Sequence, residues 1–230
     1  MTSLLRESRD GVLTLTLNRP DKLNAIDNEL ARGLLAALQA AEHDAAVRVV
    51  RLCGNGRAFC AGRDVSAAPT EDDLALVQAV AQAVVTLPKP VIAAVHGWVI
   101  GAGLEWMLDA DVVVAAESAR FRLPEASLGV FVTGGLVATL PAAAGLGRAK
   151  ALLLLGEPFT AVQAREWGLV WSVVAEEALD ACSWETAIRL AALGPEVARQ
   201  YKRVLNQVGL TAFDAAIRYE NEAQRALMPG

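Results

Sequence analysis

A run of five apolar residues, VIAAV over Val91–Val95, restricts the fold of this chain more than any other feature. A strand without polar residues is buried on both faces, which is typical of parallel sheets covered by helices. The run leads into a glycine turn and a helical pattern, and a similar apolar run returns over 111–116. This rhythm of strand, turn and helix favours right-handed crossovers. We therefore predict an α/β fold around a largely parallel sheet.

The remaining sequence continues this alternation of elements. Apolar residues at strand or helix spacing indicate each element, and glycine or proline ends it. From residue 136 onward the pattern is almost wholly helical. The predicted elements are strands over 12–17, 47–53 and 170–174, helices over 25–42 and 71–86, and a glycine-rich loop over 54–65.

Length and charge narrow the class of protein. A chain of 230 residues is long enough for one substantial core and short for two. Its net charge of −5, without a block of Lys and Arg interleaved with aromatic residues, argues against a nucleic-acid surface. The apolar content of 54% is high, so we expect the chain to bury some surface against copies of itself.

The same sequence favours a cytoplasmic protein. Charged residues within 1–10 do not fit a signal peptide, and the nearly uncharged stretch 91–104 is shorter than the roughly 20 residues that cross a bilayer. Three cysteines without a CxxC or histidine-rich spacing predict neither a disulfide framework nor a zinc site. We expect no metal and no membrane partner.

Two glycine-containing turns could supply backbone N–H groups to one point. Gly101-Ala102-Gly103 opens a helix, where the first N–H groups have no intrahelical partner and the helix dipole adds positive potential. The loop around Gly62 also follows a strand and could add one more N–H. Two such amides can stabilise an enolate or a tetrahedral anion. Small residues also allow close packing of helix on sheet, and that interpretation stays open.

Glu105 and Glu125 are the candidate acids. Two carboxylates at one pocket can divide the roles of acid and base when burial and mutual repulsion separate their pKa values. The alternatives are a solvent-facing first-turn charge for Glu105 and an ion pair with Arg120 or Arg122 for Glu125.

Five longer segments follow one another along the chain: NRPDKLNAID (18–27), AFCAGRDV (58–65), KPVIAAVHGWVIGAGLE (89–105), DADVVVAAESARFRLPEASLGV (109–130) and GEPFTAVQAREWGLVWSVV (156–174). Together and in this order, they resemble the enoyl-CoA hydratase/isomerase, or crotonase, superfamily. The resemblance implies a crotonase-like spiral of ββα repeats over 1–174 and a C-terminal helical region over 175–230, shorter than is usual, that mediates oligomerisation. It also implies a homotrimer or a dimer of trimers.

The resemblance further implies roles for the candidate residues. The carbonyl oxygen of an acyl-CoA thioester accepts hydrogen bonds from the backbone N–H groups of Arg63 and Ala102. Glu105 and Glu125 add water to a 2-enoyl-CoA and give a 3-hydroxyacyl-CoA. Coenzyme A is then part of the substrate, and no separate cofactor is expected. The residues that the resemblance places along coenzyme A are Lys22, Leu23, Ala25, Ala61, Asp64 and Val65.

Other interpretations remain open at this stage. Relatives with the same enolate chemistry are isomerases, in which Glu125 would be the main base, and a non-catalytic acyl-CoA-binding partner of a related enzyme is a third possibility. The segment 128–136 is shorter than in most relatives, which implies a reshaped acyl pocket. The tryptophans fit core or subunit contacts, and Trp98 and Trp106 are the ones that could instead contact an acyl chain. We expect a structural hydrogen-bonding role for His96.

Overall fold

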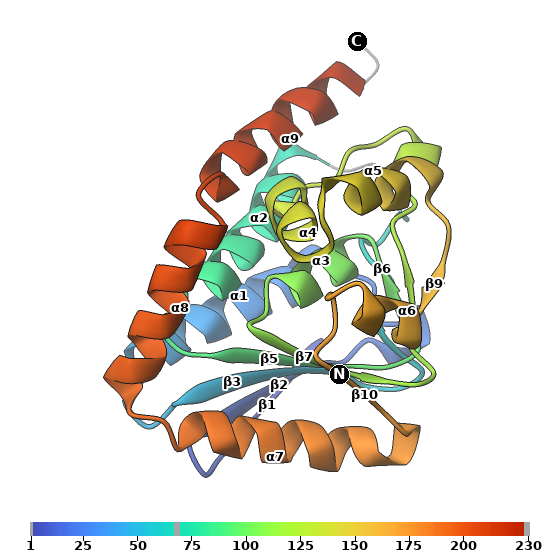
Figure 1. Ribbon diagram of the computed structural model, residues 1–230. Coiled ribbons are helices and arrows are strands. Elements are labelled where there is room, and N and C mark those ends of the chain that lie inside the picture. Colours follow the sequence, from blue (N-terminus) through green and yellow to red (C-terminus); the bar gives the residue numbers. More distant parts are fainter. Residues whose placement is uncertain (1, 67–69, 228–230) are drawn as a thin grey trace.

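The computed structural model describes residues 2–66 and 70–227 and contains four consecutive strand–strand–helix units. Each unit ends in a helix that packs beside the helix of the next (Figure 1). The units are β1 (Leu4–Arg9), β2 (Val12–Leu17) and α1 (Asn28–His43); β3 (Val49–Gly54), β4 (Ala58–Cys60) and α2 (Glu71–Thr86); β5 (Val91–Val95), β6 (Trp98–Ile100) and α3 (Ala102–Leu108); β7 (Val112–Ala116), β8 (Arg120–Arg122) and α4 (Leu136–Ala144).

The strands are divided between two sheets. A six-stranded sheet has the order β1-β2-β3-β5-β7-β10, with β10 at Ser172–Val174, and all neighbours after the β1–β2 hairpin are parallel. The second strands of the later units form a smaller sheet, β4-β6-β8-β9, with β9 at Phe159–Thr160. Repeated passage from one sheet to the other produces the predicted crotonase-like spiral, so the α/β class is confirmed.

Helices cover both faces of the six-stranded sheet. On one face lies α7 (Leu179–Ala191), which Figure 1 shows running beneath the strands and which packs against their apolar side chains. The helices α1, α2 and α3 lie on the opposite face. This two-sided cover explains why Val91–Val95 carries no polar residue, since all five are buried.

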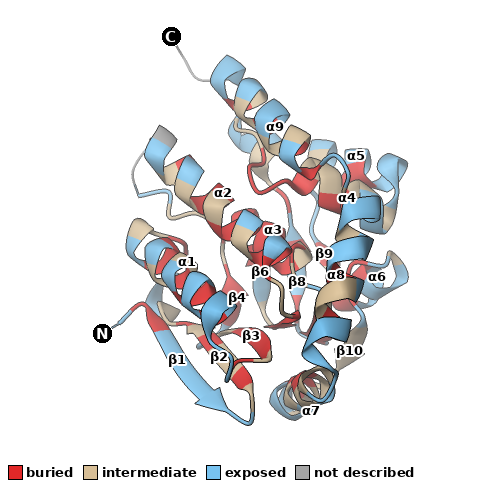
Figure 2. Cartoon of the chain, turned by 90° about the vertical axis from the view of Figure 1, so that its left-hand side faces the viewer, coloured by how far each residue is buried: buried red, intermediate tan, exposed pale blue. Residues whose placement is uncertain are grey.

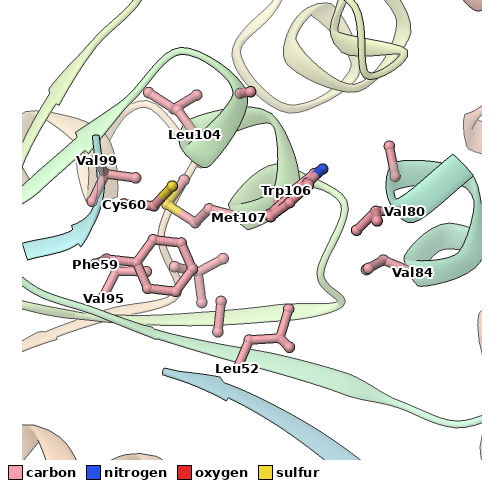
Figure 3. Close-up of a cluster of buried hydrophobic side chains, with 14 of the residues drawn as sticks. Leu52, Phe59, Cys60, Val80, Val84, Val95, Val99, Leu104, Trp106 and Met107 are labelled. Atoms are coloured by element: carbon pink, nitrogen blue, oxygen red, sulfur yellow. The ribbon is translucent and has the colours of Figure 1, made fainter. Parts of the chain in front are cut away.

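The large core cluster lies between this sheet and the helices of the spiral. Figure 3 shows Trp106 of α3 extending toward Val80 and Val84 of α2. The indole N–H of Trp106 donates to the carbonyl of Val77 at 3.2 Å, so its polar atom is satisfied inside the core. Packing of Trp106 against α2 thus fixes the position of α3, which begins at Ala102.

The helices after the spiral pack against it. They are α5 (Leu146–Leu155), α6 (Ala161–Glu166), α8 (Pro195–Gly209) and α9 (Phe213–Leu227). Buried Lys202 ties α8 to the spiral through hydrogen bonds to the carbonyl of Val84 and the carboxylate of Asp111, both at 2.8 Å. Figure 2 shows α9 with a mostly exposed outer surface and a few buried residues on its inner side. Within the described residues, no helix is long and apolar enough to cross a bilayer.

Several boundaries differ from those predicted. The first helix begins at Asn28 rather than at 25, because Leu23 and Asn24 have positive φ and the Asp27 side chain caps the helix by accepting the Leu30 N–H. The loop predicted over 54–65 contains β4. This strand and the equally short β6 and β8 have three residues each, too few to show a period.

Candidate functional site

A cavity of about 300 Å³ opens between the loop after β4, the start of α3 and the segment after β8. Leu74 and Gln224 add contributions from α2 and α9. Most of the predicted site residues meet here although they are distant in sequence. Those that line the cavity are Ala61, Arg63, Asp64, Val65, Ala102, Glu105 and Glu125.

The two glycine turns approach each other at the cavity. A Cβ on Gly62, whose φ is +85°, would lie 2.8 Å from the carbonyl oxygen of Ile100 and 3.7 Å from the nitrogen of Ala102. A Cβ on Gly103 would lie 2.7 Å from the Cβ of Cys60. The glycines therefore permit close packing, as one interpretation held, and that packing brings the two backbones together.

At this contact, the backbone N–H groups of Ala102 and Arg63 have no hydrogen-bond partner within the part of the chain that the structure describes. Ala102 is the first residue of α3, so its N–H cannot bond within the helix. Next to Arg63, the Gly62 carbonyl and the Asp64 N–H both bond to Ile26, at 2.8 and 2.9 Å. In extended backbone, neighbouring residues direct their N–H groups to opposite sides, so the Arg63 N–H points away from Ile26.

Glu105 is buried, with 1% of its surface exposed, and its carboxylate is held by the segment after β8. Thr133 donates to it twice, from its backbone N–H at 3.1 Å and from its hydroxyl at 3.2 Å. Burial raises the pKa of Glu105, and the hydrogen bonds from Thr133 and Gly134 oppose that rise. The interpretation of Glu105 as a solvent-facing helix charge is therefore wrong.

Glu125 begins the short 3-10 helix η2 (Glu125–Leu128), directly after a proline. Its Oε2 atom is buried and accepts no hydrogen bond from any described residue. Burial, and next the negative charge of Glu105, raise the pKa of Glu125 to about 8. The alternative ion pair is not found, because Arg120 donates to backbone carbonyls of the preceding turn and Arg122 donates to the carbonyl of Gly156.

The cavity thus combines two carboxyl groups with raised pKa values and two free backbone donors. Such a combination can move a proton while an anion forms on a carbonyl oxygen. Within the described residues, no three side chains of His, Cys, Asp or Glu are arranged to hold a metal ion.

Comparison with known proteins identifies the family. A family model described as enoyl-CoA hydratase/isomerase matches residues 7–227. The chain belongs to the enoyl-CoA hydratase/isomerase family.

Individual relatives agree with this assignment. The chain is 36% identical over 235 residues to the 1,2-epoxyphenylacetyl-CoA isomerase of Escherichia coli K12, a match that covers 98% of this chain and 90% of the relative. It is 36% identical to the 2,3-dehydroadipyl-CoA hydratase of the same organism, with 96% and 89% covered. An enoyl-CoA hydratase crystal structure from Mycobacterium avium subsp. paratuberculosis K-10 superposes with a TM-score of 0.93 at 32% identity, covering 99% of this chain and 91% of that one.

The segment that family resemblance placed along coenzyme A lies beside the cavity. The Ala61 N–H donates to the carbonyl of Leu23 at 3.0 Å, which joins this segment to the loop after β4. Leu23 and its neighbours Lys22 and Ala25 do not line the cavity, and Lys22 is exposed. A role for these residues in binding coenzyme A stays a prediction.

Two tryptophans proposed as acyl-chain contacts do not line the cavity. Trp106 is packed in the core, and Trp98 lies on β6 with 40% of its surface exposed. The acyl-contact interpretation is therefore wrong for this cavity. His96 forms a hydrogen bond with the carbonyl of Gly56 at 2.9 Å, which fits the structural role predicted for it.

Sequence reasoning missed three polar residues that shape this family member's site. They are Thr133, Gln224 and Glu220. The side chain of Gln224 accepts the Phe131 N–H at 2.7 Å. The carboxylate of Glu220 accepts the N–H groups of Gly135 and Val137 at 2.8 and 2.9 Å. Gln224 and Glu220 belong to α9, whereas their partners follow β8. No periodicity or residue spacing in the sequence connects α9 with the segment after β8. The short stretch Thr133-Gly134-Gly135 was the one sign in the sequence that other residues pack closely against this segment.

Proposed function

We propose that this protein hydrates a 2-enoyl-CoA thioester to a 3-hydroxyacyl-CoA. The observation that carries the proposal is that buried Glu105 and Glu125, whose Oε2 is buried, line one cavity with Arg63 and Ala102, the residues of the two backbone N–H groups. Two carboxyl groups allow one to accept a proton while the other donates one, which addition of water to a double bond requires.

In the proposed mechanism, the two glutamates hold one water molecule beside the substrate double bond. The water oxygen bonds to the β-carbon and its proton passes to Glu105, while Glu125 delivers its proton to the α-carbon. A pKa of about 8 keeps Glu125 protonated at neutral pH. Proton exchange between the two carboxyl groups then restores the starting state.

Negative charge develops on the thioester oxygen during this addition. The backbone N–H groups of Arg63 and Ala102 would meet it, and because both are fixed by the surrounding packing they need not reorganise. The identity of the side chain at 63 or 102 matters little for such a donor.

Coenzyme A would lie between the two segments that flank the cavity. Lys22, Leu23 and Ala25 would contact it on one side, and Ala61, Asp64 and Val65 on the other. The exposed Lys22 ammonium can meet a phosphate as a point charge.

We also propose that the chain forms a homotrimer or a dimer of trimers. Exposed apolar residues recur along α8 at helical spacing, which supports burial of this face between subunits. They are Val197, Tyr201, Val204, Leu205 and Val208.

The test is loss of the enoyl absorbance of crotonyl-CoA together with a gain of one water in the product mass. We expect Glu125→Gln to lower turnover by at least ~100-fold, with little change in coenzyme A affinity. The matched control is Glu117→Gln, which lies on the exposed turn after β7 outside the cavity. Full hydratase activity in Glu125→Gln would refute the mechanism.

An isomerase that shifts the double bond is the second candidate. It is supported by the family description, enoyl-CoA hydratase/isomerase, and by Glu125, whose unpaired Oε2 could serve as a single base once the carboxyl group ionises near its pKa of about 8. Incubation with a 3-enoyl-CoA separates the two candidates, because an isomerase converts it to a 2-enoyl-CoA of the same mass, whereas the proposed hydration acts only on a 2-enoyl-CoA and leaves it unchanged.

A further inference from the structure

Arg63 lines the cavity, and its guanidinium forms no hydrogen bond to any described residue. Of this side chain, 22% is exposed. Its ion-pair contact is with Asp73 in the first turn of α2, where Nη2 and Oδ2 are 3.8 Å apart. That separation exceeds hydrogen-bond distance. A guanidinium carries five N–H donors and stays protonated, so this charge has no matched acceptor.

The carboxylate of Asp73 forms its hydrogen bonds with residues other than Arg63. Its Oδ2 accepts the Thr70 N–H at 2.8 Å and its Oδ1 accepts from the Asn28 side-chain amide at 2.5 Å. These bonds, led by that from the Thr70 backbone, hold the pKa of Asp73 at about 2. The carboxylate is therefore held in the capping box of α2, in which Thr70 is the N-cap and Asp73 the N3 residue, and its orientation is not set by Arg63.

The other carboxyl groups around the cavity do not pair with Arg63 either. Asp64 is joined to Arg19 at 3.0 Å, Glu105 is held by hydrogen bonds from the segment after β8, and Glu125 has a pKa of about 8 and is neutral at pH 7. With 22% of its side chain exposed, Arg63 has lost part of its solvation, and this burial lowers the pKa of Arg63. An anion that entered the cavity would replace the solvation that the guanidinium has lost.

Arg63 also fixes where such an anion would lie on the substrate. Its backbone N–H faces the proposed thioester oxygen, and its side chain reaches roughly 7 Å from Cα with bonds of about 1.5 Å. The same cavity is lined by apolar residues, among them Leu74 from α2 and Val130 and Phe131 from the segment after β8. An acyl chain of about four to six carbons can therefore lie along these residues and end at the guanidinium.

We propose that the cavity takes short enoyl-CoA thioesters whose acyl chain ends in a carboxylate, and that the Arg63 guanidinium binds this carboxylate. The planar fork of arginine matches a carboxylate in two parallel hydrogen bonds, and the interaction is strongest where water is excluded. The proposal rests on the proposed function for the placement of the thioester, but it concerns a separate contact at the far end of the acyl chain.

Calorimetry with two saturated thioesters of equal length tests the proposal. Adipyl-CoA carries the terminal carboxylate and hexanoyl-CoA lacks it. We expect the wild-type protein to bind adipyl-CoA at least ~10-fold more tightly, because its carboxylate gives the guanidinium two charge-assisted hydrogen bonds that hexanoyl-CoA lacks. Arg63→Met should reduce this preference to about one. The matched control Arg32→Met removes the same charge from the exposed face of α1 and should keep the wild-type preference.

Two further variants strengthen the test. Asp73→Asn removes the competing negative charge while keeping an acceptor for the Thr70 N–H, so the preference for adipyl-CoA should rise. Arg63→Lys keeps the positive charge but loses the planar guanidinium, so the preference for adipyl-CoA over hexanoyl-CoA should fall only in part. This variant replaces Arg63→Met in the test if Arg63→Met does not fold.

Two results would overturn the proposal. One is equal binding of both thioesters by the wild-type protein. The other is equal weakening of both by Arg63→Met, which would place the guanidinium on a coenzyme A phosphate. Neither depends on turnover, so a protein that prefers adipyl-CoA but does not hydrate any enoyl-CoA would refute the proposed function alone.

Discussion

The backbone of Gly101 lies directly against the carboxylate of Glu125: a Cβ at position 101 would be 2.5 Å from Oε1. Gly101 also has a φ of +51°, which residues with a side chain rarely adopt. The peptide that follows carries the N–H of Ala102. The acid and the proposed oxyanion donor are therefore held in one fixed relation by a residue without a side chain.

Replacing Gly101 by alanine should separate these two groups. The added Cβ displaces the carboxylate of Glu125, and we expect turnover to fall by at least ~100-fold, since general acid catalysis depends on position. The strained backbone should also cost about 1–3 kcal/mol of stability. Gly147→Ala is the control, because nothing lies within 4 Å of a Cβ at this position and both properties should stay close to wild type. Wild-type turnover in Gly101→Ala would contradict the geometry.

Hydration should weaken in alkaline solution. Glu125 has a pKa raised from 4.5 to about 8, so the protonated form, which the proposed mechanism requires as the acid, persists through neutral pH and is lost as pH rises through about 8. A plot of kcat/KM against pH should therefore fall above that value, with an apparent pKa that belongs to the coupled pair Glu105 and Glu125. A profile that instead rises between pH 7 and 9 would show that ionised Glu125 is the active form.

Asp109 should make the folded state less stable as pH rises. Both of its carboxylate oxygens are buried and accept no hydrogen bond from described residues, and burial raises its pKa well above 3.8. The unfolded chain loses this proton near pH 4 whereas the folded chain retains it, so stability falls as pH increases from there toward the folded pKa. Below pH 4 both states are protonated and the effect disappears.

Asp109→Asn removes this titration. We expect the variant to gain about 1–3 kcal/mol over wild type at pH 8 and much less at pH 4.5, measured by urea unfolding at both values. Glu177→Gln, an exposed carboxylate in the 3-10 helix Glu176–Ala178, is the control and should not change the pH dependence. Parallel stability curves for Asp109→Asn and wild type would disprove the assignment.

Glu220 should link the last helix to the cavity wall. It is fully buried and accepts the N–H groups of Gly135 and Val137 at the start of α4. Glu220→Ala leaves both donors unpaired, and we expect a loss of about 2–4 kcal/mol. Glu222→Ala changes an exposed residue of the same helix and should have no measurable effect on unfolding. An unchanged unfolding midpoint in Glu220→Ala would exclude this link.

The sequence predicted those elements whose pattern is long or uniform. The bounds of α2, Glu71–Thr86, and of β5, Val91–Val95, agree with the prediction because helical period and continuous burial leave a local signal. β4, at Ala58–Cys60, was missed because its pairing partner, rather than its own composition, makes it a strand.

The residues of the candidate site also divide into those with a signal in the local sequence and those without one. Glu105 and Glu125 were found as polar residues in unusual surroundings, and family resemblance joined them to Arg63 and Ala102. The structure places all four on one cavity. Gln224 could not be found in this way, because its hydrogen bond to Phe131 joins positions 93 residues apart. Contacts of that kind arise from the packing of helices and have no period in the sequence.

The position of α9 has a consequence for the nascent chain. The cavity wall after β8 is held by Gln224 and Glu220, close to the end of the described residues. While α9 is still inside the ribosome, the strands and the glycine turns can already fold, but this wall has no partner. Affinity for a thioester should thus be gained only once α9 has been synthesised, and binding of such a ligand would report that α9 has docked.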